Sequence, residues 1–104
     1  MDYKELVKRL IEGYQDMLGD VAYTQAGKVE GLEVVKAEVS GEINSETVTD
    51  LVEIYKEIVG QGSYGVARKT VKKIYHDDSS VAELDIPEKI KPKELKAESF
   101  ASAL

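Results

Sequence analysis

Cysteine and tryptophan are absent from this chain of 104 residues, and histidine occurs once. Without cysteine the chain has no disulfide, no thiolate nucleophile and no Cys-ligated zinc or iron–sulfur site. Its apolar runs are far shorter than the roughly 18 residues that a membrane span needs, and the first residues lack the apolar stretch and cleavage site of a secretory signal. We therefore expect a cytoplasmic protein.

What is present is typical of one small globular domain. The chain is 42% hydrophobic and 33% charged, with only two prolines, a composition that argues against wholesale disorder. Its net charge of −6 favours solubility and disfavours general adhesion to phosphate backbones or anionic lipid. A local basic patch is still compatible with this balance.

Self-comparison indicates an internal repeat. Displacing the chain by 41 residues aligns Leu10–Gly19 with Leu51–Gly60, and nine identities fall between positions 5 and 28. Self-similarity at a fixed offset is the signature of duplication, although a shared amphipathic pattern also raises the similarity of any two helices. We predict a first copy over residues 2–32 and a second copy over residues 43–76.

Each copy begins with an amphipathic helix. Apolar residues recur at spacings of three, four and seven in both copies, which places them on one stripe. Asp2, followed by Glu5, is a predicted N-cap, as is Asn44 or Ser45 in the second copy. The glycines at positions 19 and 60 mark the predicted helix ends.

A second helix follows in each copy. Residues 63–76 have helical spacing behind the short turn Gly60–Gly62, whereas the corresponding helix of the first copy is weakened by Gly27 and Gly31. We therefore predict a mainly α fold of two tandem helix-turn-helix hairpins in a four-helix arrangement. This repeat domain covers residues 1–80.

Outside the repeats the pattern changes. Alternating residues in 33–41 predict a short strand, for which 81–86 is a possible partner. Residues 81–104 form a predicted C-terminal appendage or tail, in which Leu95 and Phe100 are the apolar anchors of a short helix or a loose segment.

The segment Gly60–Val66 has the spacing G-x-G-x-x-G and resembles the glycine-rich loop of protein kinases. The resemblance covers about ten residues, and the catalytic-loop and metal-binding motifs of kinases are missing from the chain. A dinucleotide site needs a strand before the first glycine, where this sequence predicts a helix. We expect a turn between two helices.

One helix face is strongly basic. On a helix over 63–76, five cationic or titratable residues share a face opposite the apolar stripe: Arg68, Lys69, Lys72, Lys73 and His76. Such a face is a candidate for binding nucleic acid or a partner, and the alternative is a solvated surface that faces the acidic remainder of this chain or of a partner subunit. Residues 76–78 carry an imidazole and two carboxylates, but three adjacent residues cannot surround a metal ion.

Two pairs of tyrosines are equivalent in the repeat. Tyr14 corresponds to Tyr55, and Tyr23 corresponds to Tyr64. The pairs are candidates for lining a small-ligand pocket between the two copies. The alternative is that tyrosine fills core volume with its hydroxyl at the edge.

These features favour a non-catalytic function. We expect no cofactor, no metal and no enzymatic activity, because no candidate nucleophile accompanies the single histidine. The leading hypothesis is a protein-interaction or regulatory module of a cytoplasmic complex, with a homodimer expected. The alternatives are a nucleic-acid-binding regulator and a small-ligand sensor.

Overall fold

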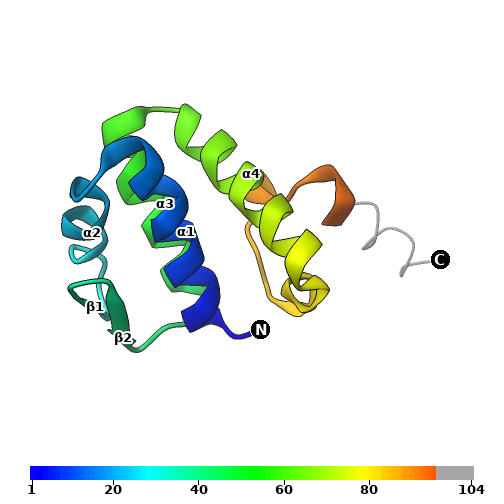
Figure 1. Cartoon of the computed structure of the whole chain (residues 1–104), viewed down its shortest axis with the longest axis horizontal. Coiled ribbons are helices and arrows are strands. Elements are labelled where there is room, and N and C mark those ends of the chain that lie inside the picture. Colours follow the sequence, from blue (N-terminus) through cyan, green and yellow to red (C-terminus); the bar gives the residue numbers. More distant parts are fainter. Residues whose placement is uncertain (96–104) are drawn as a thin grey trace.

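The computed structural model describes residues 1–95 of the chain, and this part is mainly helical, which confirms the predicted fold class at that level. The helices and strands, in chain order, are α1 (Tyr3–Leu18), α2 (Val21–Ala26), β1 (Leu32–Val35), β2 (Glu38–Gly41), α3 (Ser45–Val59), α4 (Gly62–Asp77) and the short 3-10 helices η1 (Ser79–Glu83) and η2 (Glu88–Ile90). Helices α1 and α3 lie side by side in the centre, with α2 and the β-hairpin on one side and α4 on the other (Figure 1).

Helices α1 and α3 both begin at side-chain caps. The Asp2 carboxylate accepts a hydrogen bond from the Glu5 amide at 2.8 Å at the start of α1. At the start of α3 the Asn44 side chain accepts from the Thr47 amide, and the Thr47 hydroxyl accepts from the Asn44 amide, which completes a capping box. Asn44 is therefore the cap, and Ser45 is the first residue of the helix.

Helices α1 and α3 end in the same conformation. Gly19 and Gly60 have φ values of 63° and 68°, in the left-handed region where glycine is favoured. Each glycine amide donates a 2.8 Å hydrogen bond to the carbonyl four residues earlier, that of Gln15 or Lys56. The chain then turns at once into α2 or α4, so the segment with kinase-like spacing is a helix end and the first turn of α4.

The second helices differ in length. Helix α2 has 6 residues and α4 has 16, in agreement with the weaker pattern after Gly19. Gly27 follows α2 directly, and the chain then enters the β-hairpin instead of continuing as a helix. Helix α4 therefore continues beside α1 as far as Arg9, which pairs with Asp77 at the end of α4.

The strand prediction was partly wrong. Residues 33–41 contain two strands, because the chain reverses at Lys36, whose φ is 57°, and pairs with itself in an antiparallel hairpin that places Val34 opposite Val39. The predicted partner, 81–86, is not a strand. It is the end of η1 and an extended segment that buries Val81 and Ile86 in the core, so its alternating pattern reflects burial without a ladder.

The described part of the C-terminal segment packs against α4. Its core residues are apolar side chains at most 2% exposed: Val81, Ile86, Ile90 and Leu95. The Tyr3 hydroxyl accepts a 2.8 Å hydrogen bond from the Asp85 amide, which ties the segment to α1. The second predicted anchor, Phe100, lies outside the described residues.

Helices α1 and α4 approach closely at Gly13. A Cβ atom at this position would lie 2.3 Å from the Thr70 hydroxyl oxygen and 3.2 Å from its methyl carbon. The Thr70 hydroxyl is itself held, because it donates to the Val66 carbonyl at 2.9 Å. The absence of a side chain at Gly13 therefore sets the distance between the two helices.

We predict that Gly13→Ala destabilises the fold by about 1 kcal/mol, since overpacking costs about 1–3 kcal/mol and the better helix propensity of alanine returns about 1 kcal/mol. In a Thr70→Ala background the destabilisation caused by Gly13→Ala should decrease or become a stabilisation. Urea unfolding followed by circular dichroism measures both values. Gly62→Ala is the control, because nothing lies within 4 Å of its added Cβ. An equal effect of Gly13→Ala in both backgrounds would contradict the close contact.

Candidate functional site

Two candidate pocket residues, Tyr14 and Tyr55, stack on each other in the core. Their ring centroids are 3.9 Å apart, the ring planes are inclined by 20°, and both side chains are fully buried. The rings fill space between α1 and α3 and line neither of the hollows described below. They therefore hold α1 and α3 together in the core.

The hydroxyl of each tyrosine forms a hydrogen bond with the backbone at the start of a neighbouring helix. Tyr14 donates to the Ser63 carbonyl at the start of α4 at 2.7 Å, and Tyr55 donates to the Ala22 carbonyl at the start of α2 at 2.5 Å. Burial raises the pKa of Tyr14 from 10.0 to about 12, against a smaller lowering by the Ser63 hydroxyl. Burial also raises the pKa of Tyr55, with a further contribution from Tyr14. Ionisation of either ring is therefore unfavourable in the folded state.

The other tyrosine pair diverges. The Tyr23 hydroxyl donates to Gln15 at 3.0 Å, whereas the Tyr64 hydroxyl donates to Glu53 at 2.9 Å. The ammonium groups of Lys56 and Lys89 lie 5.4 and 5.2 Å from the centre of the Tyr64 ring, within cation–π range. The four tyrosines thus do not converge on one cavity.

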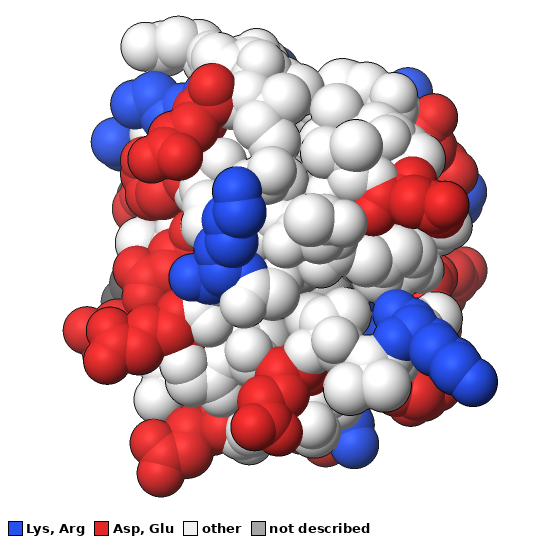
Figure 2. Space-filling view, turned by 90° about the vertical axis from the view of Figure 1, so that its left-hand side faces the viewer, with Lys and Arg blue, Asp and Glu red and all other residues white. Residues whose placement is uncertain are grey.

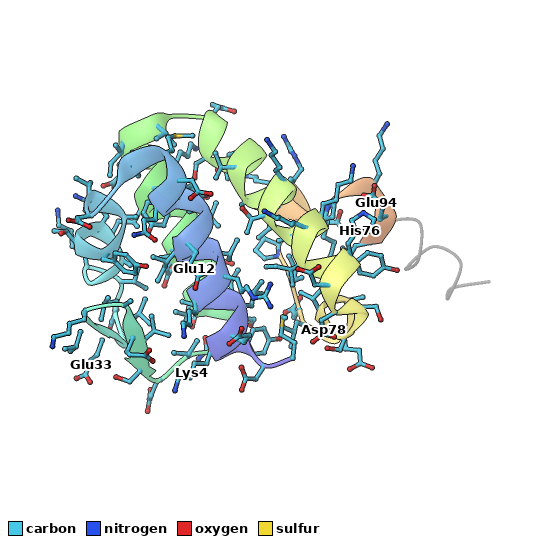
Figure 3. The ribbon with its side chains drawn as sticks, viewed as in Figure 1. Lys4, Glu12, Glu33, His76, Asp78 and Glu94 are labelled. Carbon is cyan, nitrogen blue, oxygen red and sulfur yellow. The ribbon has the colours of Figure 1, made fainter. Side chains whose placement is uncertain are left out.

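One part of the basic face of α4 contacts the C-terminal segment, and the other part lies beside α1. Arg68 donates to the Lys89 carbonyl at 3.1 Å, and Lys72 pairs with Glu94 at 3.5 Å. His76 lies at the same end of α4 as Glu94 (Figure 3). These three residues therefore face the C-terminal segment.

The remaining two basic residues, Lys69 and Lys73, line a groove between α1 and α4 with a volume of about 690 Å³. The α1 wall carries the carboxylates of Glu12 and Asp16, and Gly13 of α1 faces Thr70 of α4 between them. The other lining residues are Arg9, Gln15, Met17, Tyr23, Val66, Thr70, Ile74 and Asp77. We call this the α1–α4 groove.

The walls of the α1–α4 groove have opposite charge. Within residues 1–95, none of Glu12, Asp16, Lys69 and Lys73 forms an ion pair, and all four are exposed. At one end of the groove an ion pair links the two walls, because the Arg9 guanidinium lies 3.6 Å from the Asp77 carboxylate. The charges along the rest of the groove are therefore available to a ligand.

A smaller hollow beside α2 and the hairpin has a volume of about 540 Å³ and shares Gln15 and Tyr23 with the groove. On that side of the molecule Lys and Arg side chains stand apart between Asp and Glu side chains (Figure 2). In that view Asp and Glu side chains gather along the left-hand edge, whereas Lys and Arg side chains form no patch of their own.

Other site types find little support in the described residues. No group of three or more His, Asp or Glu side chains within 1–95 is placed to hold a metal ion. The helices described there are also too short or too polar to cross a bilayer. Comparison with protein-family models, curated proteins and solved structures finds no significant match to this chain.

Sequence reasoning identified Lys69 and Lys73 and allowed for acidic residues opposite them, but it did not identify Glu12 and Asp16 as those residues. One signal was available: Gly13 interrupts an otherwise regular amphipathic helix, and a glycine there often marks a close helix contact. Nothing in the local pattern identified the helix that makes this contact. The acidic wall becomes part of a site only through the tertiary pairing of α1 with α4.

We predict that Tyr14→Phe lowers the free energy of unfolding by about 1 kcal/mol at neutral pH, through loss of one buried hydrogen bond. Since the folded-state pKa is above 10.0, the tyrosine contributes stability below pH 10 that is lost as pH rises towards 12. Urea unfolding at increasing pH should therefore show a shallower alkaline decline in the variant. Identical slopes in both proteins would contradict this assignment.

Proposed function

We propose that this chain is a non-catalytic protein-interaction module whose binding surface is the α1–α4 groove. The observation that carries the proposal is the pair of oppositely charged, unpaired walls: Glu12 and Asp16 on one side, Lys69 and Lys73 on the other. Charged groups arranged in this way orient a partner and exclude partners of the wrong pattern. Two parallel rows of opposite charge require a partner that carries the complementary pattern.

The shape of the groove supports a macromolecular partner. It is open along two helices, and it includes the half-exposed Met17 and the partly buried Val66 beside polar residues. Small-molecule sites are more enclosed and predominantly apolar. A protein partner that contacts both helices suits such a surface better than a small molecule.

The predicted repeat accounts for the asymmetric position of the groove. Under the offset of 41, Ser63 corresponds to Ala22, so the bonds Tyr14–Ser63 and Tyr55–Ala22 are equivalent contacts. Buried, half-buried and exposed positions also coincide over Leu10–Gly19 and Leu51–Gly60. We infer that two duplicated helical hairpins form the framework, and that function lies where they differ.

That difference is in the second helices. Lys73 corresponds to Leu32, which is buried at the start of β1, and Gly13 corresponds to Ile54. The first copy therefore has no long basic helix, and α3 carries Ile54 where α1 has the glycine that contacts α4.

The nucleic-acid alternative has weaker support. Arg68 and Lys72 already contact the C-terminal segment, and Lys69 and Lys73 lie opposite Glu12 and Asp16. A phosphate backbone that reached these lysines would also approach the two carboxylates, which would repel it.

We predict that protein partners depend on the groove. Immobilised wild-type chain and the Glu12→Lys/Asp16→Lys variant are each used to capture proteins from a lysate of the native source cells. Each captured protein is then purified and titrated against both chains. Affinity should fall at least about tenfold, because the reversed charges repel the partner's complementary groups.

The matched control is Asp50→Lys/Glu57→Lys. It makes the same charge change at exposed positions of α3 that do not line the groove. Loss of affinity in both variants would indicate a net-charge effect, and unchanged affinity in the groove variant would contradict the proposed surface.

We also predict no salt-sensitive binding of duplex DNA or RNA by the wild-type chain. Titrations at about 50 and about 200 mM salt test this, since phosphate-driven affinity falls steeply over that range. Binding that weakens at the higher salt and disappears when Arg68, Lys69, Lys72 and Lys73 are replaced by alanine would favour the nucleic-acid function instead.

A further inference from the structure

We propose that the partner which fits the α1–α4 groove is a second copy of this chain, so that the module forms a twofold-symmetric dimer through this surface. The inference rests on the proposed function, because it assigns a partner to the same groove. It follows from the placement of acidic and basic residues on separate helices of one face, which makes that face complementary to itself.

The charges on the two walls lie at matching levels. Helices α1 and α4 run antiparallel, with Arg9 beside Asp77 at one level and Gly13 beside Thr70 at the next (Figure 1). Glu12 and Asp16 therefore lie opposite the stretch of α4 that carries Lys69 and Lys73. Glu12 and Lys73 both lie between these two levels, and Asp16 and Lys69 both lie beyond the second level.

Only one symmetry brings these charges together in a dimer. A twofold axis that lies between the two surfaces and runs along the helices places α1 of one copy over α4 of the other, at the same level. Glu12 and Asp16 of each copy then face Lys69 and Lys73 of the other, and every such contact occurs twice, as in any isologous interface.

The alternative axis is excluded by electrostatics. An axis that lies between the surfaces and runs across the helices would place α1 over α1 and α4 over α4. Acidic residues would then face acidic residues and basic would face basic, which is repulsive. The separation of the two signs onto two helices thus determines the orientation of the dimer.

An apolar contact completes the interface at one end of the groove. Met17 is 56% exposed and lies at the C-terminal end of α1, where Val66 lines the opposite wall. The same rotation places Met17 of each copy over Val66 of the other. The interface therefore combines apolar burial at this end with paired charges along the groove, and Arg9 and Asp77 lie at the opposite end.

The proposal is tested with two charge-reversal variants of the full chain. Glu12→Lys/Asp16→Lys makes both walls basic, and Lys69→Glu/Lys73→Glu makes both walls acidic. Multi-angle light scattering should give twice the monomer mass of 11.5 kDa for the wild type and the monomer mass for each variant alone. An equimolar mixture of the two variants should recover the dimer mass, because each acidic wall then faces a basic one.

Recovery in the mixture separates a lost interface from a lost fold, since two misfolded variants would not restore each other. The matched controls are Asp50→Lys/Glu57→Lys and Lys4→Glu/Lys28→Glu, which alter exposed residues that do not line the groove and should remain dimeric. If a reversal does not fold, Glu12→Gln/Asp16→Asn replaces it, and its dimer should dissociate at a higher protein concentration than the wild type.

Three results would overturn the inference: a monomeric wild type at every concentration, variants that remain dimeric alone, or a mixture that stays monomeric. The first result leaves the proposed function standing if a captured protein still depends on the groove. Failure of both the dimer and groove-dependent capture would remove the proposed function as well.

Discussion

The contact between Tyr14 and Tyr55 is the constraint on which the arrangement of helices depends. The ring of Tyr14 extends from α1 and that of Tyr55 from α3, the two rings stack, and their hydroxyls donate to the first turns of α4 and α2. Because the acceptors are backbone carbonyls near the glycine turns, the stack fixes where α2 and α4 begin. The Ser63 hydroxyl adds a further bond to the Val52 carbonyl, which holds α4 against α3 as well.

The α1–α4 groove follows from this starting point. Helix α4 begins at the tyrosine contact, touches α1 again at Gly13 and Thr70, and is joined to it at the far end by Arg9 and Asp77. On its other side the C-terminal segment covers part of the basic face. The remaining lysines therefore face α1, so the charge pattern of the groove results from contacts made on both sides of α4.

Local signals in the sequence predicted much of the helical structure. The caps at Asp2 and Asn44 and the glycine turns depend on a few neighbouring residues, so spacing and residue type were sufficient to locate them. The hairpin was harder, because its turn at Lys36 lacks the glycine or asparagine that usually marks a two-residue connection. The acidic wall was inaccessible to this reasoning, since an exposed carboxylate on an amphipathic helix has the same local pattern whether or not a basic helix lies beside it.

The stacked tyrosines also give the protein an internal optical reporter. In the absence of tryptophan, the aromatic signal in near-ultraviolet circular dichroism comes from tyrosine and a single phenylalanine, and a rigid buried pair contributes strongly to it. Helix content is read separately in the far ultraviolet. A condition that separates α1 from α3 while the helices persist would weaken the first signal and leave the second, so the two spectral regions distinguish loss of docking from loss of helix.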